Sequence, residues 1–319
     1  MKYKINYINH WKWVREMETS FIHVNELSKS FDQQTVLQNV NFQVKKGEII
    51  GLIGPNGAGK TTFIRILNGV IKQDKGTIAI NGLNPLKDGD DIRKMSGIVT
   101  ESAGLYHQMS GEENLRFFSE LYGVKNKNRI IELLMLFDLI DHKDKQVGKY
   151  STGMKKRLAL AKALLHKPDI LFLDEPTNGL DPDGIKLVLS YLKKYNEETG
   201  TTMIICSHVL HQLETVCQSF AFIDHGTIVE QGTLATLAEK YIKLLKVEIE
   251  TTLKPTTPEY LGYKYSIGGN KLIFELPSRQ EISRLLNEIL KTNEVFSVST
   301  LNTDLESIYF KVRENHHDK

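Results

Sequence analysis

The sequence predicts an α/β protein with a parallel-sheet core, an antiparallel β subdomain, a helical subdomain and a small C-terminal α+β accessory domain. Three patterns carry this prediction. A glycine-rich loop at residues 54–62 follows an apolar run and precedes a helical pattern. A wholly apolar run at residues 170–173 is typical of a parallel strand covered on both faces. Between them, about residues 102–166 show helical spacing, and we expect them to form an insert between strands.

The strands are expected where β-branched and apolar residues alternate or run together between turn residues. In chain order they are residues 21–24, 36–44, 49–53, 76–80, 97–100, 170–175, 201–206, 221–223, 227–229, 246–250, 271–276 and 295–299. Residues 29–31 fall between the first two strands, Asn81-Gly82 closes the fourth, and residues 224–226 turn the chain between two strands of a hairpin.

The helices are expected where apolar residues recur every three or four positions. In chain order they are residues 63–67, 110–121, 129–139, 154–166, 183–198, 208–216, 233–243, 278–291 and 304–312. Ser110 and Glu113 form a capping box before the second of these helices. Apolar residues 133–137 are expected in the core or in a patch that faces a partner subunit, rather than in a cofactor-binding segment, and residues 143–149 are expected to form a solvated loop.

The length of 319 residues suggests about two domains. We expect an N-terminal tail at residues 1–20, a first domain at residues 21–243 and an accessory domain at residues 244–319. The tail holds both tryptophans, Trp11 and Trp13, without a clear period. It is either a mobile tail or the product of an upstream start codon, or else it is a segment that contacts a partner or a membrane.

The composition is that of a soluble globular protein, with 40% hydrophobic and 25% charged residues. A net charge of +2 gives no reason to expect a nucleic-acid partner. Two cysteines suit a reducing compartment, and no apolar run approaches the roughly 18 residues of a membrane span. We therefore expect a cytoplasmic protein whose membrane role, if it has one, needs a partner.

The glycine-rich loop has the spacing G-x-x-x-x-G-K-T, with a strand before it and a helix after it, as a phosphate-binding loop requires. Glycines let successive backbone N–H groups converge on a phosphate, and the helix N-terminus adds partial positive charge. Lys60 would reach the β- and γ-phosphates, and the Thr61 hydroxyl would bind Mg²⁺. The alternative is a glycine-rich turn that happens to precede a lysine. The candidate ATP-binding residues of the loop are Gly54, Pro55, Asn56, Gly57, Ala58, Gly59, Lys60, Thr61 and Thr62.

Further polar residues follow predicted strands or precede a helix. Asp174 ends an apolar strand, where a carboxylate can bind Mg²⁺, and Glu175 beside it is a candidate base for an attacking water. His208 follows another strand and could hold a γ-phosphate or orient Glu175. Residues 151–154, before a basic helix, are a candidate second anion site.

Together, and in this order, these stretches resemble the P-loop NTPase cassette of an ATP-binding-cassette (ABC) transporter subunit, over about residues 21–243. The resemblance assigns residues 54–62 to Walker A, residues 170–175 to Walker B with its glutamate, residues 179–182 to the D-loop and His208 to the switch histidine. It further assigns the signature, the Q-loop position, the D-loop aspartate and the adenine-stacking aromatic to Ser151, Thr152, Gly153, Met154, Glu101, Asp181 and Phe31.

The resemblance implies a mechanism. Two cassettes pair head to tail, as a homodimer or heterodimer, and ATP bound to Lys60 and Thr61 of one is capped by Ser151 and Gly153 of the other. Glu175 polarises the water, His208 senses the γ-phosphate, and Mg²⁺ is the cofactor. The implied partners are ATP, a second ATP-binding domain and a membrane permease on a separate chain, so the protein would lie on the cytoplasmic face of the cell membrane. No nucleic-acid partner is expected.

Three departures from the family pattern bear on subfamily. Thr152 and Met154 replace the usual glycine and glutamine of the signature, and Glu101 stands where glutamine is commonest. Glutamate also occurs at that position in the subfamily that serves drug, antibiotic, sodium or polysaccharide exporters. The C-terminal extension, with a final helix like residues 305–310, resembles the extension of the same subfamily.

The alternatives are a soluble ABC-family ATPase that acts on ribosomes or DNA, and a regulatory module that does not hydrolyse ATP. Ribosomal members usually carry two cassettes, and DNA-repair members carry long coiled-coil insertions, whereas this sequence shows one cassette and no such insertion. The presence of Lys60, Asp174, Glu175 and His208 argues against a module without hydrolysis.

Overall fold

The computed structural model describes residues 20–100, 104–126 and 128–317. The chain divides into two compact units, of which one ends at Gln231 and the other begins at Gly232. Helix α9 (Leu234–Tyr241), expected at the end of the first domain, therefore belongs to the second unit.

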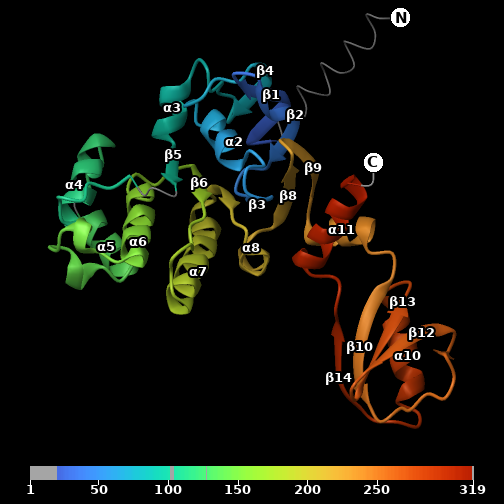
Figure 1. Cartoon of the computed structure of the whole chain (residues 1–319). Helices are drawn as coiled ribbons and strands as arrows, with labels where there is room; N and C mark the ends of the chain where they lie inside the picture. The colour runs from blue at the N-terminus through green and yellow to red at the C-terminus, as the bar shows by residue number, and fades with distance from the viewer. Residues whose placement is uncertain (1–19, 101–103, 127, 318–319) are drawn as a thin grey trace, which may run out of the picture. The chain divides into compact units, whose positions relative to one another are not determined.

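The core of the first unit is a six-stranded sheet with the order β5-β6-β7-β3-β8-β9 (Figure 1). The pairs from β5 through β8 are parallel, which confirms the predicted core. All residues of β3, β6 and β7 are buried, as expected for apolar strands covered on both faces. The strands are β3 (Ile49–Ile53), β5 (Ser96–Val99), β6 (Ile170–Asp174), β7 (Thr202–Cys206), β8 (Ser219–Asp224) and β9 (Thr227–Gly232).

The predicted antiparallel subdomain is a three-stranded sheet with the order β2-β1-β4, made of β1 (Ile22–Phe31), β2 (Gln34–Val44) and β4 (Lys75–Ile80). The expectation that residues 29–31 lie outside a strand is wrong, because β1 continues to Phe31, which pairs with Gln34. Register shifts between Val24 and Ser30 break the alternation that would have revealed the longer strand.

Four helices of the first unit border the sheets: α2 (Lys60–Leu67), α3 (Gly89–Lys94), α7 (Pro182–Thr199) and α8 (Leu210–Val216). Helix α2 begins at Lys60, earlier than its apolar pattern indicated. The sequence missed α3, since Ile92 is its one buried residue and six residues give little period. Helix α7 begins one residue before the predicted residue 183, with Asp181 as N-cap and Pro182 in the first turn.

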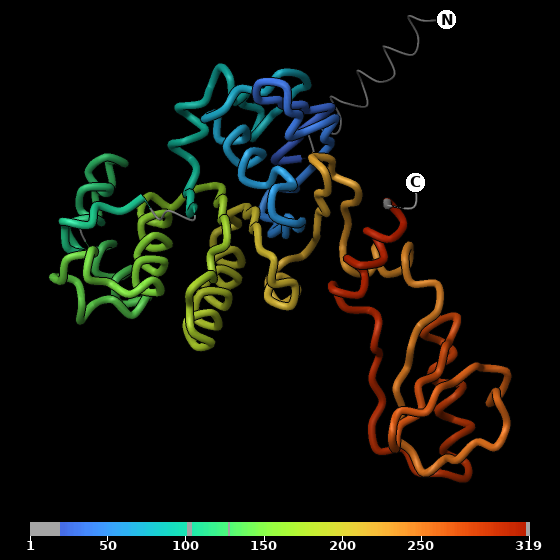
Figure 2. Tube along the Cα trace, viewed as in Figure 1, coloured from blue at the N-terminus to red at the C-terminus, as the bar shows by residue number. Residues whose placement is uncertain are grey.

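The predicted insert between β5 and β6 contains α4 (Gly111–Leu121), α5 (Asn128–Leu136) and α6 (Thr152–Ala163), which group together in the trace of Figure 2. The capping box is confirmed, because Ser110 N–H donates to Glu113 Oε2 at 2.7 Å and Glu113 N–H donates to Ser110 Oγ at 3.2 Å. Leu133, Leu134 and Phe137 are fully buried, as expected, although Met135 is exposed. Helix α5 ends before the predicted residue 139, because Asp138 adopts a left-handed conformation with φ 53°.

The second unit contains a five-stranded sheet with the order β11-β12-β13-β10-β14. Its elements are α9, β10 (Leu245–Thr251), β11 (Glu259–Tyr260), β12 (Tyr263–Gly268), β13 (Lys271–Leu276), α10 (Gln280–Ile289), β14 (Val295–Thr300) and α11 (Leu305–His317). Alternate residues of β10 and β13 pack against Leu285 and Ile289 of α10, which gives this unit its own core. The sequence missed β11 and β12, because most of their residues are exposed and polar.

Within the described parts of the chain, no helix combines the length and the apolar character needed to cross a membrane.

Candidate functional site

A cavity of about 470 Å³ lies where the loops after β3, β6 and β7 come together. The carboxyl ends of parallel strands share one edge of a sheet, so residues far apart in sequence meet there. The lining residues are Val36, Asn56, Gly57, Gly59, Lys60, Thr61, Thr62, Asp174, Glu175, Asn178 and His208. The structure thus brings the predicted phosphate loop, metal carboxylate, general base and histidine into one site.

The phosphate loop owes its course to two glycines in left-handed conformations, Gly57 with φ 82° and Gly59 with φ 103°. At Gly54 a methyl group would overlap the carbonyl oxygen of Ile223 on β8, so the loop needs a residue without a side chain there. Helix α2 begins immediately after Gly59, whose position as N-cap leaves the first N–H groups of the helix without a capping side chain among the described residues. The loop and the helix terminus therefore present backbone donors suited to an anion.

The Lys60 side chain folds back over this loop. Its Nζ donates to the carbonyl oxygens of Gly54 at 2.7 Å and Pro55 at 3.0 Å. Lys60 is only 8% exposed, but it is one of the residues that line the cavity. A buried ammonium held at the loop can meet a phosphate with little loss of side-chain entropy.

Thr61 and Asp174 supply oxygen atoms to the cavity from two different elements. Thr61 Oγ1 donates to Asp174 Oδ2 at 3.0 Å, so a hydroxyl from α2 meets a carboxylate from β6. Burial raises the pKa of Asp174, and the Glu175 charge adds to that effect, while the Thr61 hydrogen bond and the Lys60 and Lys156 charges oppose it. Hydroxyl and carboxylate oxygens are the ligands that Mg²⁺ prefers, so this pair fits the predicted metal.

Glu175 is fixed on three sides in a left-handed conformation with φ 49°. Its N–H donates to the Cys206 carbonyl at 2.9 Å, and the Ser207 hydroxyl donates to Oε2 at 3.3 Å. His208 Nδ1 lies 2.9 Å from Oε1. Of the two roles predicted for His208, this contact provides the geometry for orienting Glu175. The backbone strain is of a kind concentrated at functional sites.

The signature residues lie elsewhere, at the N-terminus of α6, and none of them lines the cavity. Ser151 is the N-cap of α6, with Oγ accepting from the Met154 N–H at 3.1 Å. A methyl group at Gly153 would lie 3.3 Å from the Gly179 carbonyl oxygen, so the start of α6 packs closely on the D-loop. Asp181 in that loop caps α7 by accepting from Gly184 N–H at 3.1 Å.

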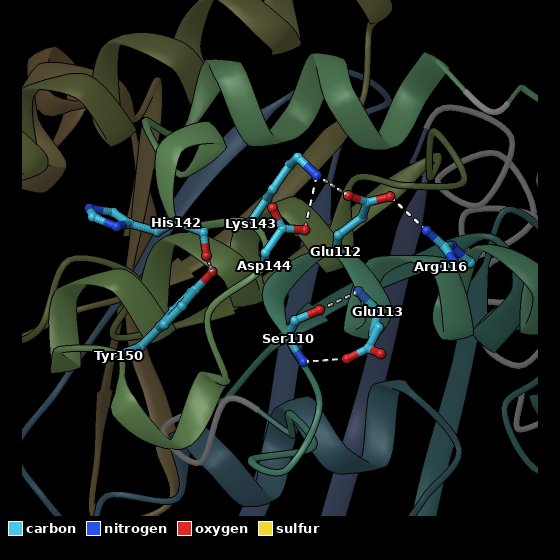
Figure 3. A network of polar contacts seen from close by, with 8 residues as sticks. All are labelled: Ser110, Glu112, Glu113, Arg116, His142, Lys143, Asp144 and Tyr150. Carbon is cyan, nitrogen blue, oxygen red and sulfur yellow. Dashed lines mark hydrogen bonds and ion pairs between the residues drawn. The ribbon is translucent and has the colours of Figure 1, made fainter.

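The segment before Ser151 is anchored by a polar network of which the sequence revealed only the Ser110–Glu113 capping box (Figure 3). Buried Tyr150 donates its hydroxyl to the His142 carbonyl at 2.7 Å and lies directly against Gly111 of α4. Lys143 Nζ binds Glu112 at 2.8 Å and Asp144 at 3.0 Å, while the Lys143 carbonyl accepts from Glu112 N–H at 2.9 Å. The expectation of a merely solvated loop at residues 143–149 is therefore wrong at Lys143.

Two predicted site residues stand apart. Phe31, at the end of β1, is 42% exposed with Lys29 Nζ 5.0 Å from its ring centroid, and it is not among the residues that line the cavity. Glu101 lies outside the described residues, as does the tail with Trp11 and Trp13.

Sequence reasoning missed Val36 and Asn178 in the cavity wall. The Val36 carbonyl oxygen lies 3.0 Å from where a methyl group on Gly59 would be, so a contact with β2 brings it to the site. No local pattern signals this. Asn178 was within reach, because it sits between two recognised motifs, and its N–H donates to the Glu175 carbonyl at 3.2 Å.

Comparison with known proteins gives consistent matches. The family profile described as "ABC transporter" matches residues 37–178. The bacitracin transport ATP-binding protein BcrA of Bacillus licheniformis is 38% identical over 72% of this chain and 76% of its own length. An uncharacterized ABC transporter ATP-binding protein, YdbJ of Bacillus subtilis, is 31% identical over 95% of this chain and 98% of its own length. A solved structure described as an ATP-binding subunit of an ABC transporter superposes with a TM-score of 0.65 at 30% identity, covering 70% of this chain and 93% of that one.

Proposed function

Because this chain belongs to the family of ABC transporter ATP-binding proteins, we propose that its ATPase activity powers an exporter whose membrane-spanning subunit is a separate chain. The observation that carries the proposal is a single cavity in which the phosphate loop, the Thr61–Asp174 pair and the Glu175–His208 pair meet.

Each of these groups has a distinct part in hydrolysis. The loop N–H groups and Lys60 bind the phosphates of ATP and offset their negative charge. Thr61 and Asp174 would hold Mg²⁺, which supplies further positive charge beside the phosphates. Glu175 accepts the proton of the attacking water, and His208 keeps the carboxylate turned toward it through the 2.9 Å contact.

The site of one chain lacks the signature, since residues 151–154 do not line its cavity. Ser151 and the N-terminus of α6 that it caps would supply a second set of anion-binding groups, and Ser151 and Thr152 are exposed. We infer that two cassettes pair head to tail, so that the signature of each completes the cavity of the other. ATP bound between the two cassettes would then hold them together as a dimer.

The exporter assignment draws on the relatives. One of them is named as a bacitracin transport protein, and a second relative, from Bacillus subtilis, is named as a linearmycin resistance ATP-binding protein. We propose that this chain likewise acts at the cytoplasmic face of a membrane with a permease partner. Fractionation of cells with and without that partner tests this: the chain should pellet with membranes only when the partner is present.

Replacing Glu175 by glutamine tests the assigned chemistry. The amide cannot accept a proton, so phosphate release should fall by roughly a hundred- to ten-thousand-fold. Binding of Mg²⁺–ATP should persist, because Lys60, Thr61 and Asp174 are unchanged. The matched control is Glu197→Gln on the exposed surface of α7, which should leave both unaltered. Hydrolysis at the wild-type rate in Glu175→Gln would place the catalytic carboxylate elsewhere.

A further inference from the structure

The sheet of the second unit has two edges of very different character. One edge is β11, which is two residues long and therefore offers little backbone for pairing. The other edge is β14 (Val295–Thr300), which pairs with β10 on one side and with no strand of the described chain on the other (Figure 1). Five of its six residues are exposed, among them Phe296 at 63% and Val298 at 41%.

The free backbone groups of β14 can be assigned from its ladder. Leu301 N–H donates to the Lys246 carbonyl, so Leu301 turns its backbone toward β10. Antiparallel ladders alternate, so Ser299 and Ser297 also turn toward β10, and Val298 and Thr300 direct their N–H and C=O groups outward. Within the described part of the chain, these outward donors and acceptors pair with no other strand.

The chemistry of this edge selects its partner. The six residues, V-F-S-V-S-T, include no charged side chain, whereas proteins commonly protect exposed edges with charges or proline. A charged peptide would meet no opposite charge within the strand. A second β14 running antiparallel would set no like charges opposite one another, and its β-branched and aromatic side chains favour strand pairing.

We propose that β14 pairs with β14 of a second copy of this chain, with Val298 on the twofold axis. In that register the outward groups of Val298 bond to those of its own copy, and Phe296 stands opposite Thr300. Val298 lies opposite Ile249 of β10, on the face covered by α10, so the second strand extends the apolar face of the sheet. The two five-stranded sheets become one continuous sheet.

The pairing is weak by itself and rests on the proposed function. Six residues a side fall far short of the about 20–30 residues of a stable interface. ATP-driven pairing of the cassettes holds two copies together and raises the effective concentration of one strand for the other. The C-terminal unit then adds a second contact to the nucleotide-held dimer.

Disulfide trapping tests this pairing in the full chain carrying Glu175→Gln. In the proposed pairing, the two Val298 residues form a hydrogen-bonded pair. The Cα atoms of such a pair lie about 5.5 Å apart, within the Cα range for a disulfide. Val298→Cys should therefore cross-link to its copy when Mg²⁺–ATP and a mild oxidant are added. Ser299→Cys is the matched control, because two residues of stagger place it about 8 Å from its copy. The chain with only its native Cys206 and Cys217 gives the background.

Cross-linking at residue 298 but not at residue 299 supports the pairing, whereas no cross-link, or equal cross-linking at both, overturns it. Hydrogen exchange on the chain without added cysteines gives a second reading, since the amides of Val298 and Thr300 should become protected in the ATP-bound sample. Light scattering separately reports whether ATP holds a dimer at all. If it does not, the proposed function fails, and trapping at millimolar protein concentration still decides for or against strand pairing.

Discussion

Replacing Gly111 by alanine should destabilise the helical insert and disturb the segment that carries the signature. Gly111 is the first residue of α4, and its added methyl group would overlap the Tyr150 hydroxyl oxygen and lie 3.2 Å from Cζ of that ring. Gly111 has no left-handed backbone, so the expected cost is steric rather than conformational. Tyr150 is 4% exposed and has little room to move.

A double-mutant cycle measures the coupling free energy between Gly111 and Tyr150. Overpacking of a buried contact costs about 1–3 kcal/mol, which is the expected loss for Gly111→Ala. Tyr150→Phe removes the bond to the His142 carbonyl and should cost about 1–2 kcal/mol. In the double variant the closest clashing atom is gone and the ring carbon at 3.2 Å remains. The double variant should therefore be about 1–2 kcal/mol more stable than the sum of the single effects predicts.

Urea unfolding of the four proteins, followed by circular dichroism, measures these terms. ATPase activity of Gly111→Ala should fall as well, because Tyr150 directly precedes Ser151, and a partial recovery in the double variant would follow from relief of the clash. Strict additivity of the two substitutions would refute the reasoning, since it would mean that Gly111 and Tyr150 do not constrain each other.

Two further predictions concern charge. Lys60→Ala should weaken ATP binding about tenfold or more in calorimetry, because it removes the positive charge that contacts the β- and γ-phosphates. Lys72→Ala on the exposed surface should leave the affinity for ATP unchanged. Equal affinities for the two variants would remove the phosphate-loop assignment. Hydrogen bonds from Lys143 and then Arg116 hold the pKa of Glu112 below its ordinary value of 4.5. The stability that Glu112 adds over Glu112→Gln, about 0.3–1 kcal/mol, should be present above pH 4.5 and disappear as the pH falls through the lowered pKa; a difference that persists in acid would contradict this origin.

The parts of the site that the sequence predicted are those encoded by neighbouring residues. The spacing of Gly54, Gly59 and Lys60 between a strand and a helix specifies a phosphate loop locally, and the apolar run before Asp174 specifies a buried strand with a carboxylate at its end. The arrangement of parallel strands then brings these ends to one edge of the sheet, which is why residues assigned from separate local motifs meet in one cavity.

The parts that could not be predicted depend on contacts between distant residues or on irregular backbone. The bulges between Val24 and Ser30 hid the length of β1, and exposed polar residues hid β12. Val36 reaches the cavity only because β2 lies against Gly59. Gly111 and Tyr150 are far apart in the chain, and no local pattern indicates that one must be glycine because the other is tyrosine.

The central claim, that ATP joins two copies through the cavity of one and the signature of the other, is tested most directly by light scattering on Glu175→Gln with Mg²⁺–ATP. The account predicts twice the 36.4 kDa chain mass with ATP and the single-chain mass without it. Adding Ser151→Arg, which puts bulk at the start of α6, should return the protein to a monomer, whereas Ser190→Arg on the exposed face of α7 should leave the dimer intact. A Ser151→Arg protein that still dimerises with ATP would contradict the account.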